Sequence, residues 1–233
     1  MDDGIIIVRN NYRMFSGLKK RQYEYYILDT SPAEGQEEAF VAIETFTDMF
    51  INGDNPSGLL LIGGVGSGKT LMVSSVVNYI INSIPIPDSK ITGAKVESTP
   101  SPFGFWFYSR PKTPVQFISV ADLMNQLKEC FNDPEAGLAQ KITERLQSVE
   151  LLILDDMGAE KTSDWVQEKL FEIIDYRYNE WLPMLITTNC TPDELKKQIG
   201  ARNFDRIREM CALVPVTAKS QRQTATINNY RII

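Results

Sequence analysis

The glycine-rich run "GGVGSGKT" at residues 63–70 is the feature whose composition and spacing point most directly to chemistry. It fits the Walker A pattern G-x-x-x-x-G-K-[ST], in which glycines let the backbone approach phosphate oxygens and turn its N–H groups inward. An apolar run precedes it and a helical apolar pattern follows it, so the positive end of a helix dipole is expected at the same anion. The residues predicted to bind nucleotide are Gly63, Gly64, Val65, Gly66, Ser67, Gly68, Lys69, Thr70 and Leu71.

Lys69 and Thr70 have separate predicted roles within this run. The ammonium group of Lys69 is expected to reach the β- and γ-phosphates of ATP, and so to take part in catalysis as well as in binding of ATP or its product ADP. The hydroxyl group of Thr70 is expected to bind Mg²⁺.

Two adjacent carboxylates, Asp155 and Asp156, follow the apolar run 151–154. Charged side chains are almost never buried without a partner. In P-loop ATPases a second strand ends beside the phosphate loop with an aspartate that holds Mg²⁺ and an adjacent acid that orients the attacking water. We therefore predict Asp155 as a metal ligand together with Thr70, and Asp156 as the catalytic base. Two acids in tandem favour hydrolysis of ATP over transfer of its phosphoryl group to a small acceptor. The alternative for Asp156 is that it only caps a loop or helix.

Asn189 ends a third apolar run, "LITTN". A polar side chain at this place can reach the γ-phosphate or the attacking water, the role called sensor I in AAA+ ATPases. Asparagine also commonly ends strands at turns, so the residue alone is a weak signal. Its position one strand and one helix after the acid pair favours the catalytic role.

The elements that must position these residues follow from apolar periodicity. Strands are expected at 59–64, 115–120, 151–154 and 183–189, and helices at 33–51, 69–82, 121–131, 134–148 and 163–180. Strands that alternate with helices predict an α/β fold with a mostly parallel sheet covered on both faces. Ser163 or Asp164 is expected to cap the last of these helices. The first thirty residues are expected to be irregular, and the stretch 84–114, which holds six prolines, is either functional or disordered.

The composition narrows the class of protein. The 233 residues hold 24 Lys and Arg against 30 Asp and Glu, a net charge of −6, which disfavours a broad surface that coats nucleic acid. The absence of histidine excludes a histidine general base, and the three distant cysteines do not form a zinc pattern. Unpatterned cysteines and the lack of any apolar run of membrane-spanning length predict a cytoplasmic protein with no membrane partner.

Beyond single motifs, the chain resembles the bacterial helicase loaders of the DnaC/DnaI type and the related IstB-type transposition helper ATPases. The resemblance rests on "GLLLIGGVGSGKT", "FISVADLMNQLKECF", "LLILDDMGAEKTSDWVQEKLFEIIDYRYNEWLPMLITTN" and "ARNFDRIREM", and covers roughly residues 20–225. It implies an AAA+ P-loop fold, a three-layer αβα sandwich with a mostly parallel five-stranded sheet and a helical lid that is reduced or absent. It divides the chain into a short N-terminal segment (1–45) and an AAA+ ATPase domain (46–233) with an insertion at about 84–114.

The resemblance also assigns roles to arginines. Arg206 in "FDRIRE" matches the arginine finger, which reaches from one subunit into the ATP site of its neighbour, and Arg202 and Arg208 are rivals for that role. Arg222 in "KSQRQ" matches sensor II, an arginine that contacts the nucleotide phosphates of its own subunit. Arg177 in "YRY" is typical of the family, and we expect it to form a structural ion pair.

The function implied by the resemblance is ATP-dependent loading or remodelling of a replicative hexameric helicase on single-stranded DNA. Loaders of this kind are expected to self-associate into a ring or helical oligomer and to hydrolyse ATP slowly without a neighbouring subunit. Residues 121–146 match a helical insertion that contacts single-stranded DNA, with Lys128, Lys141 and Arg145 as the available cations. Three cations in an acidic chain predict weak binding, and an ordinary solvated helical face is the alternative.

Three other functions remain open at this point. An IstB-type helper would bind double-stranded DNA and activate a transposase, but "MDDGIIIV" is not the basic helical start usual in that group. An ATP-dependent switch or adaptor would bind nucleotide with little turnover. A small-molecule P-loop kinase is disfavoured because the acid pair indicates water as the acceptor. The segment "GFWFYSR" is either a partner-binding loop or a hairpin packed on the core.

Overall fold

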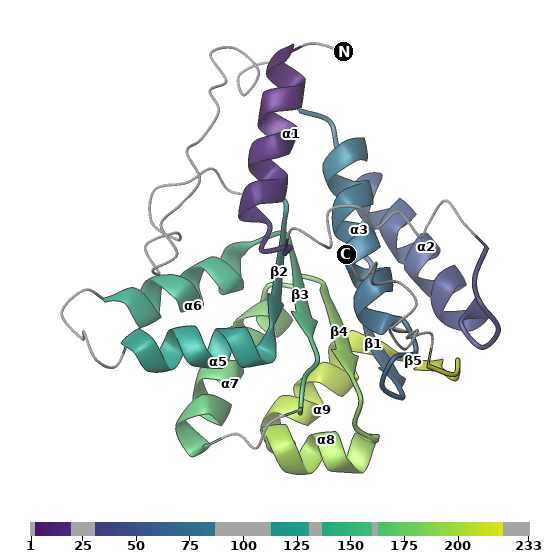
Figure 1. The fold of residues 1–233 in the computed structure, drawn as a ribbon. Helices are drawn as coiled ribbons and strands as arrows, with labels where there is room; N and C mark the ends of the chain where they lie inside the picture. Colours follow the sequence, from purple (N-terminus) through teal and green to yellow (C-terminus); the bar gives the residue numbers. More distant parts are fainter. Residues whose placement is uncertain (1–2, 20–30, 87–112, 131–136, 160–162, 221–233) are drawn as a thin grey trace, which may run out of the picture.

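The computed structural model describes residues 3–19, 31–86, 113–130, 137–159 and 163–220 (Figure 1). The strands are β1 (Gly58–Gly63), β2 (Val115–Ser119), β3 (Leu151–Asp155), β4 (Met184–Thr188) and β5 (Cys211–Val216). The helices are α1 (Asp3–Phe15), α2 (Glu37–Ile51), α3 (Lys69–Ser83), α5 (Val120–Glu129), α6 (Leu138–Ser148), α7 (Asp164–Asn179), α8 (Pro192–Ile199) and α9 (Ala201–Met210). None of the helices formed by these residues is long and apolar enough to cross a membrane.

The five strands form one parallel sheet in the order β2-β3-β4-β1-β5. The predicted parallel, five-stranded α/β architecture is therefore confirmed. β1 lies between β4 and β5, with Leu59 opposite Leu185 on one side and Ala212 on the other. Because the strands are parallel, the carboxyl ends of β1, β3 and β4 lie at the same edge of the sheet, where ligands of open α/β sheets bind.

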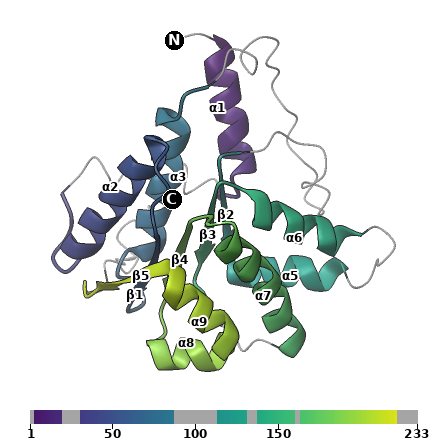
Figure 2. The same ribbon diagram turned by 180° about the vertical axis from the view of Figure 1, so that it is seen from behind.

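Helices cover both faces of the sheet, as Figures 1 and 2 show. Side chains that alternate along each strand point to opposite faces, so Leu59 and Leu61 pack with α1, α2 and α3, whereas Leu60 packs with α5 to α9. A sheet buried on both faces explains why the strand sequences are almost continuously apolar. The result is the predicted three-layer αβα sandwich.

Most predicted elements occur where the periodicity places them, with ends shifted by a few residues. The helix predicted at 33–51 begins only at Glu37, because the preceding chain turns at Gly35, whose φ is +81°. Ser163 is the cap of α7, and its hydroxyl oxygen accepts the N–H of Val166 at 3.4 Å. α8, α9 and β5, which follow Asn189, were not among the predicted elements.

The expectation of an irregular N-terminus is wrong over α1. Val8, Tyr12 and Phe15 lie one or two turns apart on this helix and are buried, which supplies the apolar face that a helix needs in order to pack. The end of α1 is joined to the edge strand β2, where the N–H of Phe117 donates to the Ser16 carbonyl oxygen at 2.6 Å. The predicted start of the domain at residue 46 falls inside α2, and the domain division stays a prediction.

The proline-containing insertion lies almost entirely outside the described residues, since 87–112 are not described. The segment "GFWFYSR" falls within that range, so the two interpretations of it stay open.

Within the part of the chain that the structure describes, Arg177 does not form the ion pair expected from the sequence. It is fully buried on α7, and its guanidinium group donates to five backbone carbonyl oxygens at 2.7–3.2 Å. Those carbonyls belong to Leu146, Gln147, Val149, Glu150 and Pro183. Burial lowers the pKa of Arg177 to about 9, which leaves it charged at neutral pH. Arg177 therefore joins the end of α6 to the starts of β3 and β4.

Replacing Arg177 with methionine is expected to lower the free energy of unfolding by about 4 kcal/mol, because several buried carbonyl groups lose their donor at once. Arg177→Lys is expected to lose about half as much, since three ammonium donors cannot reach all five oxygens. The measurement is urea unfolding, with the exposed Arg208→Met as control, for which a change within about 0.5 kcal/mol is expected. An Arg177→Met protein that unfolds at the wild-type urea concentration would contradict this assignment.

Candidate nucleotide-binding site

The glycine-rich run forms the loop between β1 and α3 at the carboxyl edge of the sheet. β1 ends at Gly63 and α3 begins at Lys69, so the first N–H groups of α3 are left without intrahelical partners, as at any helix start. The ammonium group of Lys69 donates to the carbonyl oxygens of Gly63 and Gly64, each at 2.8 Å, and to Asn189 Oδ1 at 2.8 Å. The loop therefore holds a cation next to the N–H groups that begin α3, an arrangement suited to an anion such as phosphate.

Asp155 lies at the end of β3 and is only 6% exposed. Thr70 Oγ1 lies 3.0 Å from both carboxylate oxygens, and Thr187 Oγ1 donates to Asp155 Oδ1 at 2.7 Å. The structure thus brings together Thr70 and Asp155, the two residues predicted to hold Mg²⁺. A hydroxyl and a carboxylate oxygen are ligands of the type that Mg²⁺ takes, so this pair fits the ion.

The environment of Asp155 disfavours its charged form. Burial raises the pKa of this carboxyl above its ordinary value of 3.8, and the nearby charge of Asp156 acts in the same direction. Hydrogen bonds from Thr187 and Thr70 and the charge of Lys69 oppose the rise without cancelling it. A bound cation would remove this cost, because it would supply the missing positive charge.

Asp156 and Asn189 meet just beyond the strand ends. Asp156, the residue after β3, adopts a left-handed backbone conformation, with φ of 57°. Its N–H donates to Thr187 Oγ1 at 2.9 Å, and its carboxylate accepts a hydrogen bond from Asn189 Nδ2. Because Asn189 Oδ1 accepts from Lys69, the asparagine joins the predicted catalytic base to the predicted phosphate-binding lysine.

Two residues of this site were missed by the sequence analysis. Thr187 is 1% exposed, and its hydroxyl group donates to the Asp155 carboxylate and accepts the backbone N–H of Asp156. A polar residue near the end of an otherwise apolar strand was a usable signal for it. Gln36, from the turn before α2, donates to the Ser67 carbonyl oxygen of the loop at 2.8 Å. No local pattern indicates this second contact, because its partner is far away in the sequence.

Among the described residues, the arginines predicted to act at an ATP site make their recorded contacts away from this network. Arg206 on α9 pairs with Asp175 on α7, at 3.0 Å, and with Glu209, at 3.6 Å, and its guanidinium lies 4.3 Å from the centre of the Tyr178 ring. Arg202 lies over the Phe171 ring at 3.9 Å. These contacts hold both side chains against α7. Arg208 is exposed, and Arg222 lies outside the described residues.

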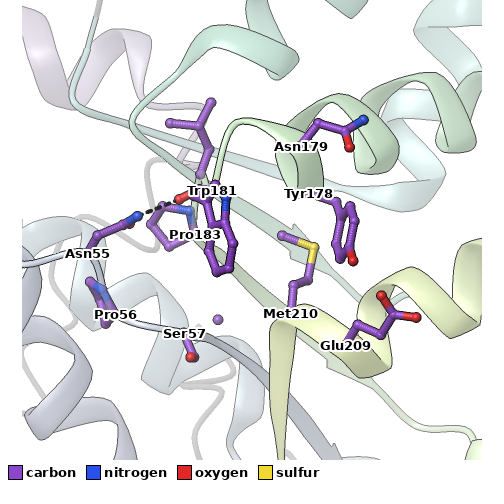
Figure 3. A pocket seen from close by; sticks show the side chains of 11 residues that line it. Asn55, Pro56, Ser57, Tyr178, Asn179, Trp181, Pro183, Glu209 and Met210 are labelled. Atoms are coloured by element: carbon purple, nitrogen blue, oxygen red, sulfur yellow. Dashed lines mark hydrogen bonds between the residues drawn. The ribbon is translucent and has the colours of Figure 1, made fainter.

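Tyr178 and Glu209 also line a pocket of about 300 Å³, shown in Figure 3. This pocket lies at the amino ends of β1 and β4, the opposite end of the sheet from Lys69. Trp181 lines the pocket and is 79% exposed, and its carbonyl oxygen accepts from Asn55 Nδ2 at 2.8 Å. The pocket is therefore separate from the phosphate-binding loop.

One of the three cations proposed for single-stranded DNA points into the protein. Arg145 Nε donates to Gln116 Oε1 at 3.1 Å, and Arg145 also donates to the Phe15 carbonyl oxygen at 3.4 Å. Arg145 therefore connects α6 to β2 and α1. Lys128 and Lys141 are exposed on α5 and α6.

Together, the strand order, the loop between β1 and α3 and the acid pair after β3 define the class, an α/β protein with a P-loop. The chain belongs to the family of IstB-like ATP binding proteins, whose model matches residues 109–228. The matched residues include Asp155, Asp156 and Asn189. Family membership confirms the resemblance seen in the sequence and implies that the chain binds nucleotide.

Two of the curated relatives are named replicative helicase loaders. The replicative helicase loader DnaC of Escherichia coli (strain K12) is 31% identical over 175 residues, which are 75% of this chain and 59% of that protein. The replicative helicase loader DnaI of Bacillus subtilis (strain 168) is 24% identical over 199 residues, 78% of this chain and 53% of that protein. The chain thus spans little more than half the length of these relatives.

Solved structures share the fold. The crystal structure of the DnaC helicase loader has a TM-score of 0.63 at 24% identity and covers 86% of this chain and 100% of that chain. The crystal structure of DnaI has a TM-score of 0.61 at 22% identity, over 86% of this chain and 95% of that one. AMPPCP-bound DnaA from Aquifex aeolicus has a TM-score of 0.58 at 19% identity, over 83% and 50%. At these identities the likeness concerns the fold.

Asp155→Asn is expected to raise the midpoint temperature of unfolding of the nucleotide-free protein near neutral pH. The amide removes the buried charge, keeps an acceptor for Thr187 and gains a donor toward Thr70. The pKa of Asp155 is raised in the folded protein. The contribution of this group to the stability of the wild type is therefore fully present below pH 3.8 and is lost as the pH rises through the folded-state pKa. The advantage of the variant should therefore grow from acid to neutral pH.

The measurement is thermal unfolding of both proteins across that pH range, with Asp54→Asn, at an exposed loop position, as control. The control is expected to follow the wild type at every pH. An Asp155→Asn variant that is less stable than the wild type at neutral pH would contradict the view that the buried charge of Asp155 destabilises the nucleotide-free protein.

Proposed function

We propose that the chain is an ATP-hydrolysing AAA+ protein that loads or remodels a replicative hexameric helicase on single-stranded DNA during the initiation of replication. The observation that carries the proposal is the single connected network in which Lys69, Asn189 and Asp156 lie next to Thr70 and Asp155. Membership of the ATP binding family and the named helicase loaders among its relatives support the same conclusion.

The residues of the network have distinct roles in this proposal. Lys69 exchanges the carbonyl oxygens of Gly63 and Gly64 for phosphate oxygens of ATP, and the N–H groups of the loop bind the same phosphates. Thr70 and Asp155 hold Mg²⁺, which neutralises charge on the phosphates when bound. Asp156 orients the attacking water, while Asn189 lies where it can contact the γ-phosphate.

In this proposal Arg206 of one subunit supplies a positive charge to the phosphates of ATP bound in a neighbouring subunit. To do so it leaves Asp175 and Glu209, which hold it loosely because about a third of its side chain is exposed. An arginine supplied in trans contributes roughly 10³ to 10⁵ in rate in phosphoryl transfer. Turnover is then slow in an isolated subunit and faster in a ring or helical oligomer.

The helicase and DNA steps rest on the relatives and on the exposed face of α5 and α6. Lys128 and Lys141 on that face bind phosphates of single-stranded DNA weakly, and several subunits together supply the affinity. Arg145 is left out of this role because its guanidinium group donates to Gln116 Oε1 and to the Phe15 carbonyl oxygen. A protein that acts on a replicative helicase would work in the cytoplasm, which is the location that we propose.

ATP hydrolysis is expected to rise cooperatively with protein concentration and to be stimulated by single-stranded DNA. Lys69→Ala should lose nucleotide binding because its ammonium group contacts the phosphates. Arg206→Ala should keep nucleotide binding and lose at least about a hundredfold in turnover, since it acts only in the assembled site. The measurements are phosphate release against protein concentration, and ATP binding by titration with a fluorescent analogue.

Arg208→Ala is the matched control, because Arg208 is on the same helix, is exposed and is a rival for the same role. Normal turnover in Arg206→Ala with a loss in Arg208→Ala moves the finger to Arg208. Turnover that is independent of concentration and normal in both variants overturns the inter-subunit site. Binding of ATP with negligible turnover under all conditions indicates a nucleotide-controlled switch.

A further inference from the structure

Gln36 makes an unusual contact for a residue at the start of a helix. It precedes α2 but does not cap it with its side chain. The side chain is instead buried, only 5% exposed, and both ends of its amide group are occupied. Oε1 accepts the N–H of Ala33 at 3.1 Å, and Nε2 donates to the carbonyl oxygen of Ser67 at 2.8 Å.

The Ser67 carbonyl group matters because it shares a peptide plane with the N–H of Gly68. The described peptide bonds are trans, so the carbonyl of Ser67 and the N–H of Gly68 point in opposite directions. When Gln36 holds the carbonyl on its own side, the N–H is directed to the other side. Gly68 is the residue before α3, so this N–H adds to those of the first turn of α3 that bind phosphate.

Space around Gly68 is filled by the same side chain. Gly68 has a φ of +98°, and a Cβ atom placed there would lie 2.5 Å from Gln36 Nε2. The glutamine therefore packs against the loop as well as binding to it. A glycine is needed at this position for its backbone conformation and for the approach of Gln36.

The turn that carries Gln36 is itself anchored to the chain beyond β5. The Gly35 carbonyl oxygen accepts the N–H groups of Thr217, at 2.9 Å, and Ala218, at 3.1 Å. Gly35 has no room for a side chain, since a Cβ atom would lie 2.7 Å from the Ala218 nitrogen. The position of Gln36 is thus fixed by contacts with the chain after β5, which are independent of the phosphate-binding loop.

We infer that Gln36 is a positioning residue for nucleotide binding, which orients the Ser67–Gly68 peptide so that its N–H points toward the phosphates. This inference rests on the proposed function, because it concerns the same site. Gln36 acts through the loop backbone, so it affects how tightly nucleotide binds and leaves the hydrolytic step unchanged.

The test is Gln36→Leu, which keeps most of the volume and removes both hydrogen-bonding groups. We expect the Kd for ATP and the KM to rise about tenfold, with kcat within about twofold of wild type, because one phosphate contact is lost in ground state and transition state alike. The Kd for ADP should rise by the same factor, because the loop N–H groups cradle the α- and β-phosphates. Titration with both nucleotides and steady-state kinetics provide the values.

Gln147→Leu is the matched control. Gln147 Nε2 also donates to a backbone carbonyl oxygen, that of Glu172 at 2.9 Å, but on the other face of the sheet. The two leucine variants therefore lose the same kind of hydrogen bond, and only Gln36→Leu should lose nucleotide affinity. Gln36→Met, which keeps an unbranched stem, replaces Gln36→Leu if that variant does not fold.

The outcomes separate this inference from the proposed function. Wild-type affinity in Gln36→Leu, or an equal loss in both leucine variants, overturns the positioning role and leaves the ATPase proposal intact. A fall in kcat with unchanged KM also overturns it, because the residue would then act on the chemical step. A wild-type protein that binds neither ATP nor ADP overturns both.

Discussion

Asp155 places a carboxylate in the interior of the protein, and a buried charge is tolerated only where donors meet it. The two donors come from separate elements, Thr70 from the first turn of α3 and Thr187 from β4. Their hydroxyl groups reach the same carboxylate only if β3 and β4 are in register and α3 starts beside them. The arrangement of the strands at the carboxyl edge of the sheet therefore depends on the buried Asp155 carboxylate. A cation would offset the free energy that burial of this charge costs.

The opposite charge in the site is handled in a different way. Lys69 is 6% exposed, and its ammonium group is satisfied by two carbonyl oxygens of its own loop and by Asn189. The asparagine separates this cation from Asp156 while contacting both. Each of these groups thus has a protein partner, and in the proposed function nucleotide, metal or water would take the place of that partner.

Three arginines show how one residue type serves different purposes in one fold. Arg177 is completely buried and binds carbonyl oxygens, so its role is structural. Arg145 connects helix and strand through Gln116. Arg206 is partly exposed and ion-paired on the surface of α7 and α9, which leaves it able to change partners. Exposure and the type of partner distinguish these roles, and charge alone does not.

The sequence by itself determined the fold class, the phosphate-binding loop and the acid pair, because these depend on strict local spacing and on backbone geometry that neighbouring residues impose. It did not determine the role of α1, whose short apolar face is meaningful only against α3 and β2. Nor did it identify Gln36 or the partners of Arg177, because their hydrogen bonds join segments far apart in the chain. Only tertiary structure decides which donors and acceptors meet, since burial forces each polar group to find a partner wherever the fold supplies one.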